Sequence, residues 1–229
     1  MSRTGSFLRV ALLMLCGLSF AAKAADDPAH IDIYVTPYYN SSGPEIQIGR
    51  YSEGLASKSE TTFLSTIQKM KSSWSSLNFI EQYVAAIRLY ELGYRKESTY
   101  WFYTAQYRGR QFGMLRNPGV EQSIGEPGFE LLQAHNSFYQ LAGPYINGYA
   151  FGDLDSLAEI IRRVQKEGKT IQDLHAIYPQ VSFRNQSEWT EQNDGLNAGL
   201  SKLLAMLTDN KDEIKQQRAE KASKRNFRN

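Results

Sequence analysis

Cysteine is nearly absent from this chain of 229 residues, in which Cys16 is the only example. A single cysteine excludes an intramolecular disulfide, so the fold must be held together by its core. Cys16 follows apolar residues, as a lipid-modified cysteine does, but Leu15 stands where lipidation requires a small residue. We therefore expect no lipid anchor.

Long apolar runs are also lacking. The apolar stretch at residues 10–22 has 13 residues, whereas a membrane-spanning helix needs about 20, and we expect no stable membrane insertion. Arg3 and Arg9 precede this stretch and Ala22-Lys23-Ala24 closes it, which is typical of a cleaved export signal. The sequence predicts that residues 1–24 are removed after Ala24 and that the protein works in a bacterial periplasm.

No strong excess of charge of one sign is present. The chain has 26 Lys and Arg against 24 Asp and Glu, and loss of the first 24 residues removes three basic residues and no acid, for a net charge of −1. Residues 211–229 are an exception, with seven basic residues against three acidic ones. Such a tail is typical of a solvated helix end, and the alternative is contact with an acidic partner or an anionic lipid. The predicted periplasmic location argues against nucleic acid.

Motifs for metal binding and nucleophilic catalysis are lacking. His30, His135 and His175 are isolated in the sequence, without the close ligand pair typical of a zinc site. The GxSxG turn of serine hydrolases is absent, since the nearest string, Gly49–Gly54, has one residue too many before Ser52. We expect no metal, no cofactor and no catalytic residue.

Acidic residues leave one catalytic alternative open. Two sets stand out, one beside an irregular segment and one at the start of a helical pattern: Glu126 and Glu130, and Asp153, Asp155 and Glu159. Because two carboxylates from distant positions can cleave glycans, a peptidoglycan-directed hydrolase is an alternative. The preference of acids for helix N-termini explains both sets without catalysis.

The periodicity of the chain predicts a mainly α fold. Alternating apolar residues at 31–35 and 46–48 predict a small N-terminal β-hairpin over residues 31–51. The rest has helical periodicity, which we interpret as antiparallel helical hairpins in a single domain over residues 25–210. Residues 211–229 form a basic helical tail in this interpretation.

Capping signals mark the predicted helices. Ser59, Asn78 and Asp153 are expected N-caps, and Gly93 suits the left-handed position after a helix end. A helix over residues 96–112 follows so closely that it should pack antiparallel to the helix before it.

The later helices have breaks at proline and glycine. Helix resumes from Phe129 with an expected bend at Gly143-Pro144, and Tyr178-Pro179 interrupts the chain again. The last helix is expected to begin near Ser187 and to run on into the charged tail.

Aromatic residues are concentrated in the 96–112 helix. Tyr100-Trp101-Phe102-Tyr103 and Tyr107 lie within two turns, and four consecutive aromatics surround a helix. Either neighbours enclose this helix on several sides, or one side faces a partner together with arginine, since Trp, Tyr and Arg are enriched at binding hot spots. Enclosure between neighbours is the favoured interpretation.

The segment Gly113–Gly128 has no periodicity, and loops of this length are often functional. If a partner binds, we expect it to contact this loop and the adjoining helix end. The predicted contact residues are Tyr107, Arg108, Arg110 and Arg116. Arginine there could pair with acidic groups of the partner. The alternative is a loop that folds back over the core and binds nothing.

Residues 85–109 resemble a Sel1-type repeat, a short relative of the tetratricopeptide helical hairpin. The family pattern is a glycine turn followed by A-x-x-W-Y-x-x-A-A-x-x-G. Leu92-Gly93 stands at the turn, and the pattern is then followed by Ser98, Trp101-Phe102, Ala105 and Gly109. The chain departs from the pattern at three positions. Ser98 replaces the first alanine, Phe102 replaces the tyrosine, and Gln106 replaces the second alanine of the Ala-Ala pair. The match covers one unit, whereas solenoids stack about three or more.

The resemblance implies protein binding rather than catalysis. Periplasmic Sel1-like proteins include immunity proteins that neutralise antibacterial effectors delivered by type VI secretion. We therefore expect a periplasmic protein-binding module, an immunity or inhibitor protein that binds its toxin directly. An envelope assembly or scaffold factor and the hydrolase described above are the alternatives.

Overall fold

The computed structural model describes residues 49–120 and 122–226, and these residues are mainly α-helical. The elements are η1 (Gly49–Tyr51), α2 (Ser52–Ala56), α3 (Glu60–Ser72), η2 (Trp74–Ser76), α4 (Phe79–Glu91), α5 (Arg95–Leu115), α6 (Pro127–Ala150), α7 (Leu154–Gly168), α8 (Leu174–Ile177), α9 (Gln186–Asp209) and α10 (Lys211–Asn226). The predicted signal segment, residues 1–24, and residues 31–48 of the predicted hairpin lie outside the described residues. The last three residues of the hairpin range form the 3₁₀ turn η1, so that part of the prediction is wrong.

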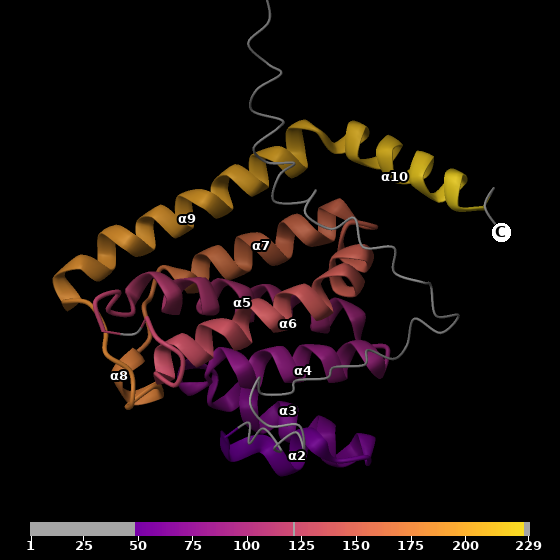
Figure 1. Cartoon of the computed structure of the whole chain (residues 1–229). Coiled ribbons are helices and arrows are strands. Elements are labelled where there is room, and N and C mark those ends of the chain that lie inside the picture. The colour runs from indigo at the N-terminus through magenta and orange to yellow at the C-terminus, as the bar shows by residue number, and fades with distance from the viewer. Residues whose placement is uncertain (1–48, 121, 227–229) are drawn as a thin grey trace, which may run out of the picture.

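Helix α5 is the centre of the fold. α4, α6, α7 and α9 all pack against it, and its contact with α4 is the most extensive. Figure 1 shows α3 beyond α4 on one side, and α9 crossing over α7 on the other. The predicted antiparallel hairpin is confirmed, because the start of α5 meets the end of α4 and its later turns meet the start of α4. Ser98 Oγ donates to the Ala86 carbonyl (2.7 Å), and Arg108 Nη1 to the Leu77 carbonyl (3.4 Å).

The predicted caps are confirmed. The Ser59 side chain accepts from the Thr62 N–H, and Asp153 accepts from the Ser156 N–H. Asn78 forms a reciprocal capping box with the third residue of α4. These local bonds satisfy N–H groups that have no partner inside the helix, and so they fix where each helix begins.

Three boundaries differ from the prediction. α5 continues to Leu115 and α6 begins at Pro127, so the connecting loop is Arg116–Glu126 rather than Gly113–Gly128. Gly113 is helical, and a Cβ there would lie only 3.1 Å from Leu132 Cδ1 of α6. The glycine thus serves close helix packing and not a turn.

The other two differences concern α6 and α9. α6 runs on through Gly143-Pro144, so the expected bend does not end that helix. α9 ends at Asp209 and α10 begins at Lys211, with Asn210 between them, so the final helix does not run unbroken into the tail.

The aromatic residues of α5 are enclosed by neighbouring helices, as favoured from the sequence. Tyr100, Trp101, Phe102, Tyr103 and Tyr107 are all buried. The rings of the first two pack against Trp74 of η2, with centroids 5.3 and 4.7 Å away. The aromatic positions around α5 are thus covered by its neighbours, while Arg110 of the same helix is exposed.

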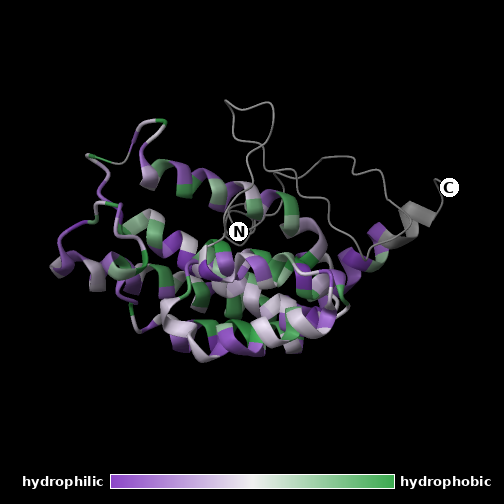
Figure 2. Cartoon of the chain, turned by 90° about the horizontal axis from the view of Figure 1, so that it is seen from below, coloured by the Kyte–Doolittle hydropathy of each residue, from purple (hydrophilic) through white to green (hydrophobic). Residues whose placement is uncertain are grey.

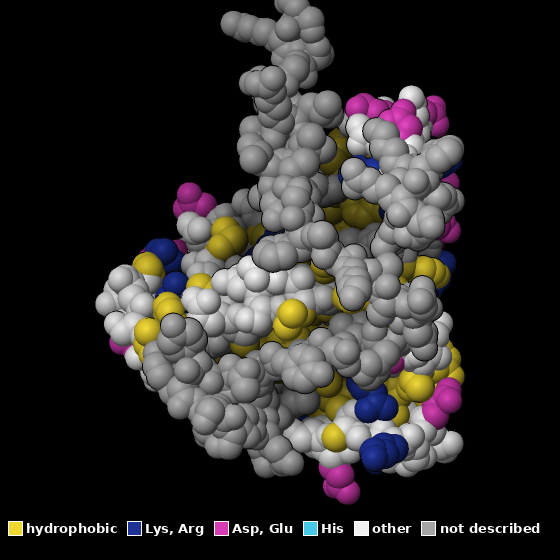
Figure 3. Space-filling view, turned by 45° about the vertical axis from the view of Figure 1, so that its right-hand side comes forward, with side chains coloured by type: hydrophobic (Ala, Val, Ile, Leu, Met, Phe, Trp, Pro, Cys, Tyr) yellow, Lys and Arg dark blue, Asp and Glu magenta, His cyan; other side chains and the backbone are white. Residues whose placement is uncertain are grey.

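Figure 2 shows hydrophobic and hydrophilic residues alternating along the helices of the body, and α10 is mostly hydrophilic. On the face shown in Figure 3, hydrophobic side chains form separate patches with charged side chains of both signs around them. No helix in the described part of the chain is both long and apolar enough to cross a membrane.

Candidate functional site

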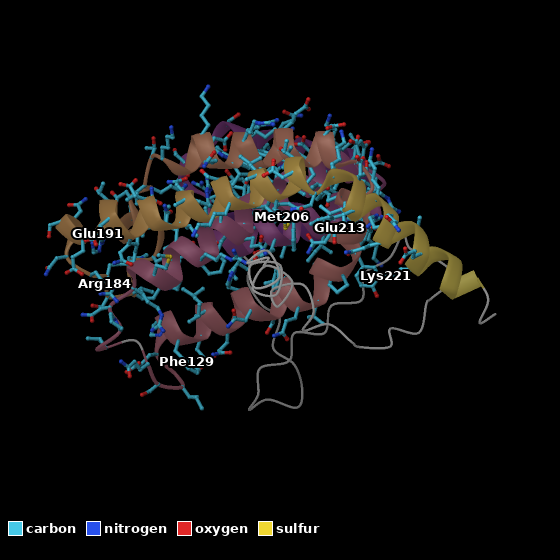
Figure 4. All side chains as sticks on the ribbon, turned by 90° about the horizontal axis from the view of Figure 1, so that it is seen from above. Phe129, Arg184, Glu191, Met206, Glu213 and Lys221 are labelled. Atoms are coloured by element: carbon cyan, nitrogen blue, oxygen red, sulfur yellow. The ribbon has the colours of Figure 1, made fainter. Side chains whose placement is uncertain are left out.

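The loop between α5 and α6, Arg116–Glu126, is fixed at its base by the segment that precedes α9. The Asn117 N–H donates to the Ser182 carbonyl (2.8 Å), and the Arg184 N–H donates to the Leu115 carbonyl (2.8 Å). Figure 4 shows Arg184 at one end of the molecule, away from α10 at the other. These two backbone hydrogen bonds, one from each of the two neighbouring segments, therefore fix the position from which the loop starts.

The far end of the loop is tied to the start of α6 by two acids. The Ser123 N–H donates to Glu126 Oε2 (2.7 Å), and the Gly125 N–H donates to Glu130 Oε1 (2.9 Å). Gly125 has a φ of 92°, which favours glycine. These two carboxylates, candidates for a catalytic pair, thus hold the loop backbone in place.

The loop presents two apolar side chains to solvent. Val120 is 51% exposed and Ile124 is 62% exposed, more than any other large hydrophobic side chain in the described part of the chain. Sequence reasoning missed both residues. The only signal was the presence of two β-branched aliphatic residues in an otherwise polar, aperiodic segment.

Tyr107, a predicted contact residue, lies inside the bundle. It is 4% exposed, and its hydroxyl is within hydrogen-bond distance of the Gly168 carbonyl (3.0 Å) and Asn193 Oδ1 (2.9 Å). It joins α5 to α7 and α9. The prediction of a surface role is therefore corrected.

Arg108 is also a structural residue. Its Nη1 donates to the Trp74 carbonyl (3.0 Å), and its guanidinium lies over the Trp74 ring at 5.0 Å from the centroid. Burial lowers its pKa to about 10, and it stays protonated at neutral pH. Arg108 holds the connection between α3 and α4 against α5, and this interaction makes it unavailable to a partner.

Two of the four predicted contact residues remain at the surface beside the loop. Arg110 is exposed on the last turns of α5, and Arg116 is half-buried at the first position of the loop. The four predicted contact residues thus differ in exposure: Tyr107 is buried, Arg108 and Arg116 are half-buried, and Arg110 is exposed.

The second set of candidate acids has other roles. Asp153 caps α7, and Asp155 pairs with Lys211 of α10 (2.7 Å). Glu159 is exposed on α7. Within residues 49–120 and 122–226, no group of three or more His, Cys, Asp or Glu side chains is placed to hold a metal ion.

A buried polar pair lies close to Arg110. The Tyr83 hydroxyl is 3.0 Å from His135 Nδ1, between α4 and α6. Burial lowers the His135 pKa to about 4, and the Arg110 charge acts in the same direction. Burial also raises the Tyr83 pKa. The imidazole is therefore neutral, and its Nδ1 shares a buried hydrogen bond with the Tyr83 hydroxyl.

Comparisons with family models, with curated proteins and with solved structures found no match for this chain.

Proposed function

We propose that this protein is a periplasmic protein-binding module, an immunity or inhibitor protein that blocks a secreted antibacterial effector by direct contact through the α5–α6 loop. One observation carries the proposal. The loop is held at both ends by hydrogen bonds, and its tip exposes Val120 and Ile124.

A loop of this kind is suited to entering a concave site. Because its ends are fixed before binding, little conformational entropy is lost when it is immobilised by a partner. Fully burying an aliphatic side chain contributes about 1.5–3 kcal/mol. Arg110 lies on α5 shortly before the loop and Arg116 is the first residue of the loop, so both can meet acidic groups around such a site.

The Sel1 resemblance of residues 85–109 supports protein binding as the general role. These residues form the second half of α4 and about the first two-thirds of α5, which together make the helical hairpin that carries the loop. The export signal supports a periplasmic location. N-terminal sequencing of the exported protein should give Ala25 as the first residue, and a chain that keeps Met1 would contradict this location.

The test is binding of residues 25–229 to the product of a neighbouring toxin gene, measured by biolayer interferometry. Val120→Ser and Ile124→Ser should each weaken binding about tenfold, since each loses most of an apolar contact. Tyr145→Ser on α6 is the matched control, because Tyr145 is another exposed large hydrophobic side chain outside the loop. Its binding should equal that of the wild type.

Two results would contradict the proposal. If the loop variants bind as the wild type does while the Tyr145 variant does not, the contact lies elsewhere on the molecule. If no toxin binds and an envelope-assembly protein encoded nearby does, the protein is an assembly factor instead.

A further inference from the structure

A cavity of about 580 Å³ lies at the opposite end of α5 from the loop. Its walls come from the α4–α5 turn, the first turn of α5, the middle of α7 and Tyr149 at the end of α6. α5 has 21 residues, and at 1.5 Å per residue the two ends of the helix are about 30 Å apart. The cavity is therefore a separate feature from the loop.

Two arginines in the wall are each stacked on a tyrosine ring. The Arg163 guanidinium lies 3.6 Å from the centroid of Tyr100, and the Arg95 guanidinium lies 4.2 Å from that of Tyr90. A guanidinium stacked by its face keeps its edge N–H groups available for a planar anion such as a carboxylate.

The position of Arg163 is set by a third residue. Its Nε donates to Glu167 Oε1 (3.1 Å), while the Tyr100 hydroxyl donates to Glu167 Oε2 (2.6 Å). One carboxylate thus holds both the arginine and the ring on which it stacks. The Nη1 and Nη2 groups of Arg163 are not used in this hydrogen bond with Glu167, and the position of the guanidinium is set before any ligand binds.

The charge of the cavity wall is positive. Arg95, Lys96 and Arg163 face two acids, Glu97 and Glu159. Glu97 is already engaged, because its Oε1 lies 2.8 Å from Lys71 Nζ and 2.8 Å from Trp101 Nε1. Arg163 is paired with Glu167 in the same way. Arg95 and Lys96 against Glu159 then leave a net charge of +1 in the wall, which favours an anionic ligand.

A second cavity, of about 450 Å³, adjoins the first and shares Tyr94 and Glu97 with it. Its apolar wall consists of Leu64, Ile67 and Leu89. The Tyr94 hydroxyl donates to Glu60 Oε1 (2.8 Å), which fixes the ring between the two cavities. A cationic site and an apolar site therefore stand side by side.

We propose that these two cavities bind an extended acidic peptide segment of a partner protein. An Asp or Glu carboxylate is held between Arg95 and Arg163, and an apolar side chain a few residues away packs against Leu64, Ile67 and Leu89. An inorganic anion satisfies only the first cavity, whereas a peptide fills both. This site goes beyond the loop contact and does not depend on it.

The test is an NMR titration of ¹⁵N-labelled residues 25–229 with capped peptides of the form acetyl-Glu-Gly-Leu-amide and acetyl-Glu-Gly-Gly-Leu-amide. We expect saturable shifts of the backbone amides of Gly93–Glu97 and of Leu64. Replacing Glu by Gln in the peptide should weaken binding at least tenfold. Inorganic phosphate should compete only at much higher concentration than the peptides.

Variants identify the groups that bind. Arg95→Gln and Arg163→Gln should each weaken the Glu peptide about tenfold, and Leu64→Ser should weaken it without affecting phosphate. Arg162→Gln is the matched control, since Arg162 is an exposed arginine of the same helix that does not line the cavity. Circular dichroism of each variant checks that it folds. Should Arg163→Gln fail to fold, Arg95→Gln alone decides the charge requirement.

Three outcomes would overturn the proposal. The first is the absence of saturable shifts with either peptide, and the second is equal binding of the Glu and Gln peptides. The third is a response of the same amides to phosphate but to neither peptide, which would make the site an anion site without peptide recognition. None of these outcomes bears on toxin binding, which is measured separately with the loop variants.

Discussion

The imidazole of His135 occupies the space beside Gly109, where a Cβ atom would stand 2.1 Å from His135 Nδ1. This is much shorter than any contact between two atoms that are not bonded. α5 and α6 can thus lie at their observed separation at this level only because residue 109 has no side chain. The same ring is hydrogen-bonded to Tyr83 of α4, so one glycine permits three helices to meet.

Gly109→Ala should destabilise the protein by about 1–3 kcal/mol. Alanine is normally favoured over glycine inside a helix by about 1 kcal/mol, so a loss of stability would mean that the clash with the His135 ring outweighs this gain. Urea unfolding followed by circular dichroism measures the change.

A matched substitution and a double variant make this prediction specific. Gly199→Ala in α9 has open space around its Cβ position, and it should be neutral or stabilising by up to about 1 kcal/mol. His135→Ala should reduce the cost of Gly109→Ala, because the ring that clashes is gone. A stable Gly109→Ala variant would show that α6 can move away freely.

Tyr107→Phe should lower the free energy of unfolding by about 1–1.5 kcal/mol and leave partner binding unchanged. The hydroxyl lost in this variant contacts the Gly168 carbonyl and Asn193 Oδ1. Both acceptors keep another donor in the variant. Asn193 Nδ2 donates to the Gly168 carbonyl (2.9 Å), and Gln111 Nε2 donates to Asn193 Oδ1 (2.7 Å). The loss of stability therefore stays moderate. Tyr145→Phe, at an exposed tyrosine, should change stability by less than about 0.5 kcal/mol.

The pH dependence of stability should include a contribution from His135. Its pKa is about 4 in the folded protein against 6.5 for the ordinary side chain. The unfolded chain therefore takes up the proton first as the pH falls. The stability due to the neutral imidazole is complete above about pH 6.5 and is lost as the pH approaches 4. Between pH 7.5 and 4.5 the loss should be about 2–3 kcal/mol.

His135→Gln isolates this contribution, because a glutamine amide can still hydrogen-bond to the Tyr83 hydroxyl but does not titrate. Urea unfolding at several pH values between 7.5 and 4.5 should give a shallower decline for the variant than for the wild type. Parallel declines would mean that His135 takes up its proton at the same pH in the folded and the unfolded protein.

The parts of the fold that were predictable from the sequence depend on local interactions. Ser59, Asn78 and Asp153 cap helices by bonds that span three residues, so the spacing in the sequence shows them. The end of α5 was predicted too early, since Gly113 is helical because of its packing against Leu132. A glycine that admits a neighbouring helix and a glycine that forms a turn look the same in one sequence.

The candidate site was predictable only in part, for the same reason. The loop was visible as a break in periodicity. Arg108 is held against the bundle by the Trp74 carbonyl, which is 34 residues away, so its structural role could not be predicted from local sequence. The exposure of Val120 and Ile124 depends on how the loop leaves the bundle, and the cavity beside Arg95 and Arg163 joins residues from two distant helices.

Removal of residues 211–229 should lower the melting temperature by less than about 4 °C. α10 is tied to the body mainly by the exposed Lys211–Asp155 pair and by Arg218, whose Nη2 donates to the Gly148 carbonyl (3.0 Å). Exposed ion pairs contribute little to stability. Ile214 is the only large apolar side chain among the described side chains of α10, and it is only partly buried.

A longer truncation provides the contrast for this prediction. Ending the chain after Gly199 also removes Leu203, Leu204 and Leu207, the last of which is fully buried against the body. That variant should lose its cooperative thermal transition, whereas the chain ending at Asn210 should keep it. If the shorter deletion lowers the melting temperature by about 10 °C or more, α10 is an integral part of the domain and its basic residues have a structural role.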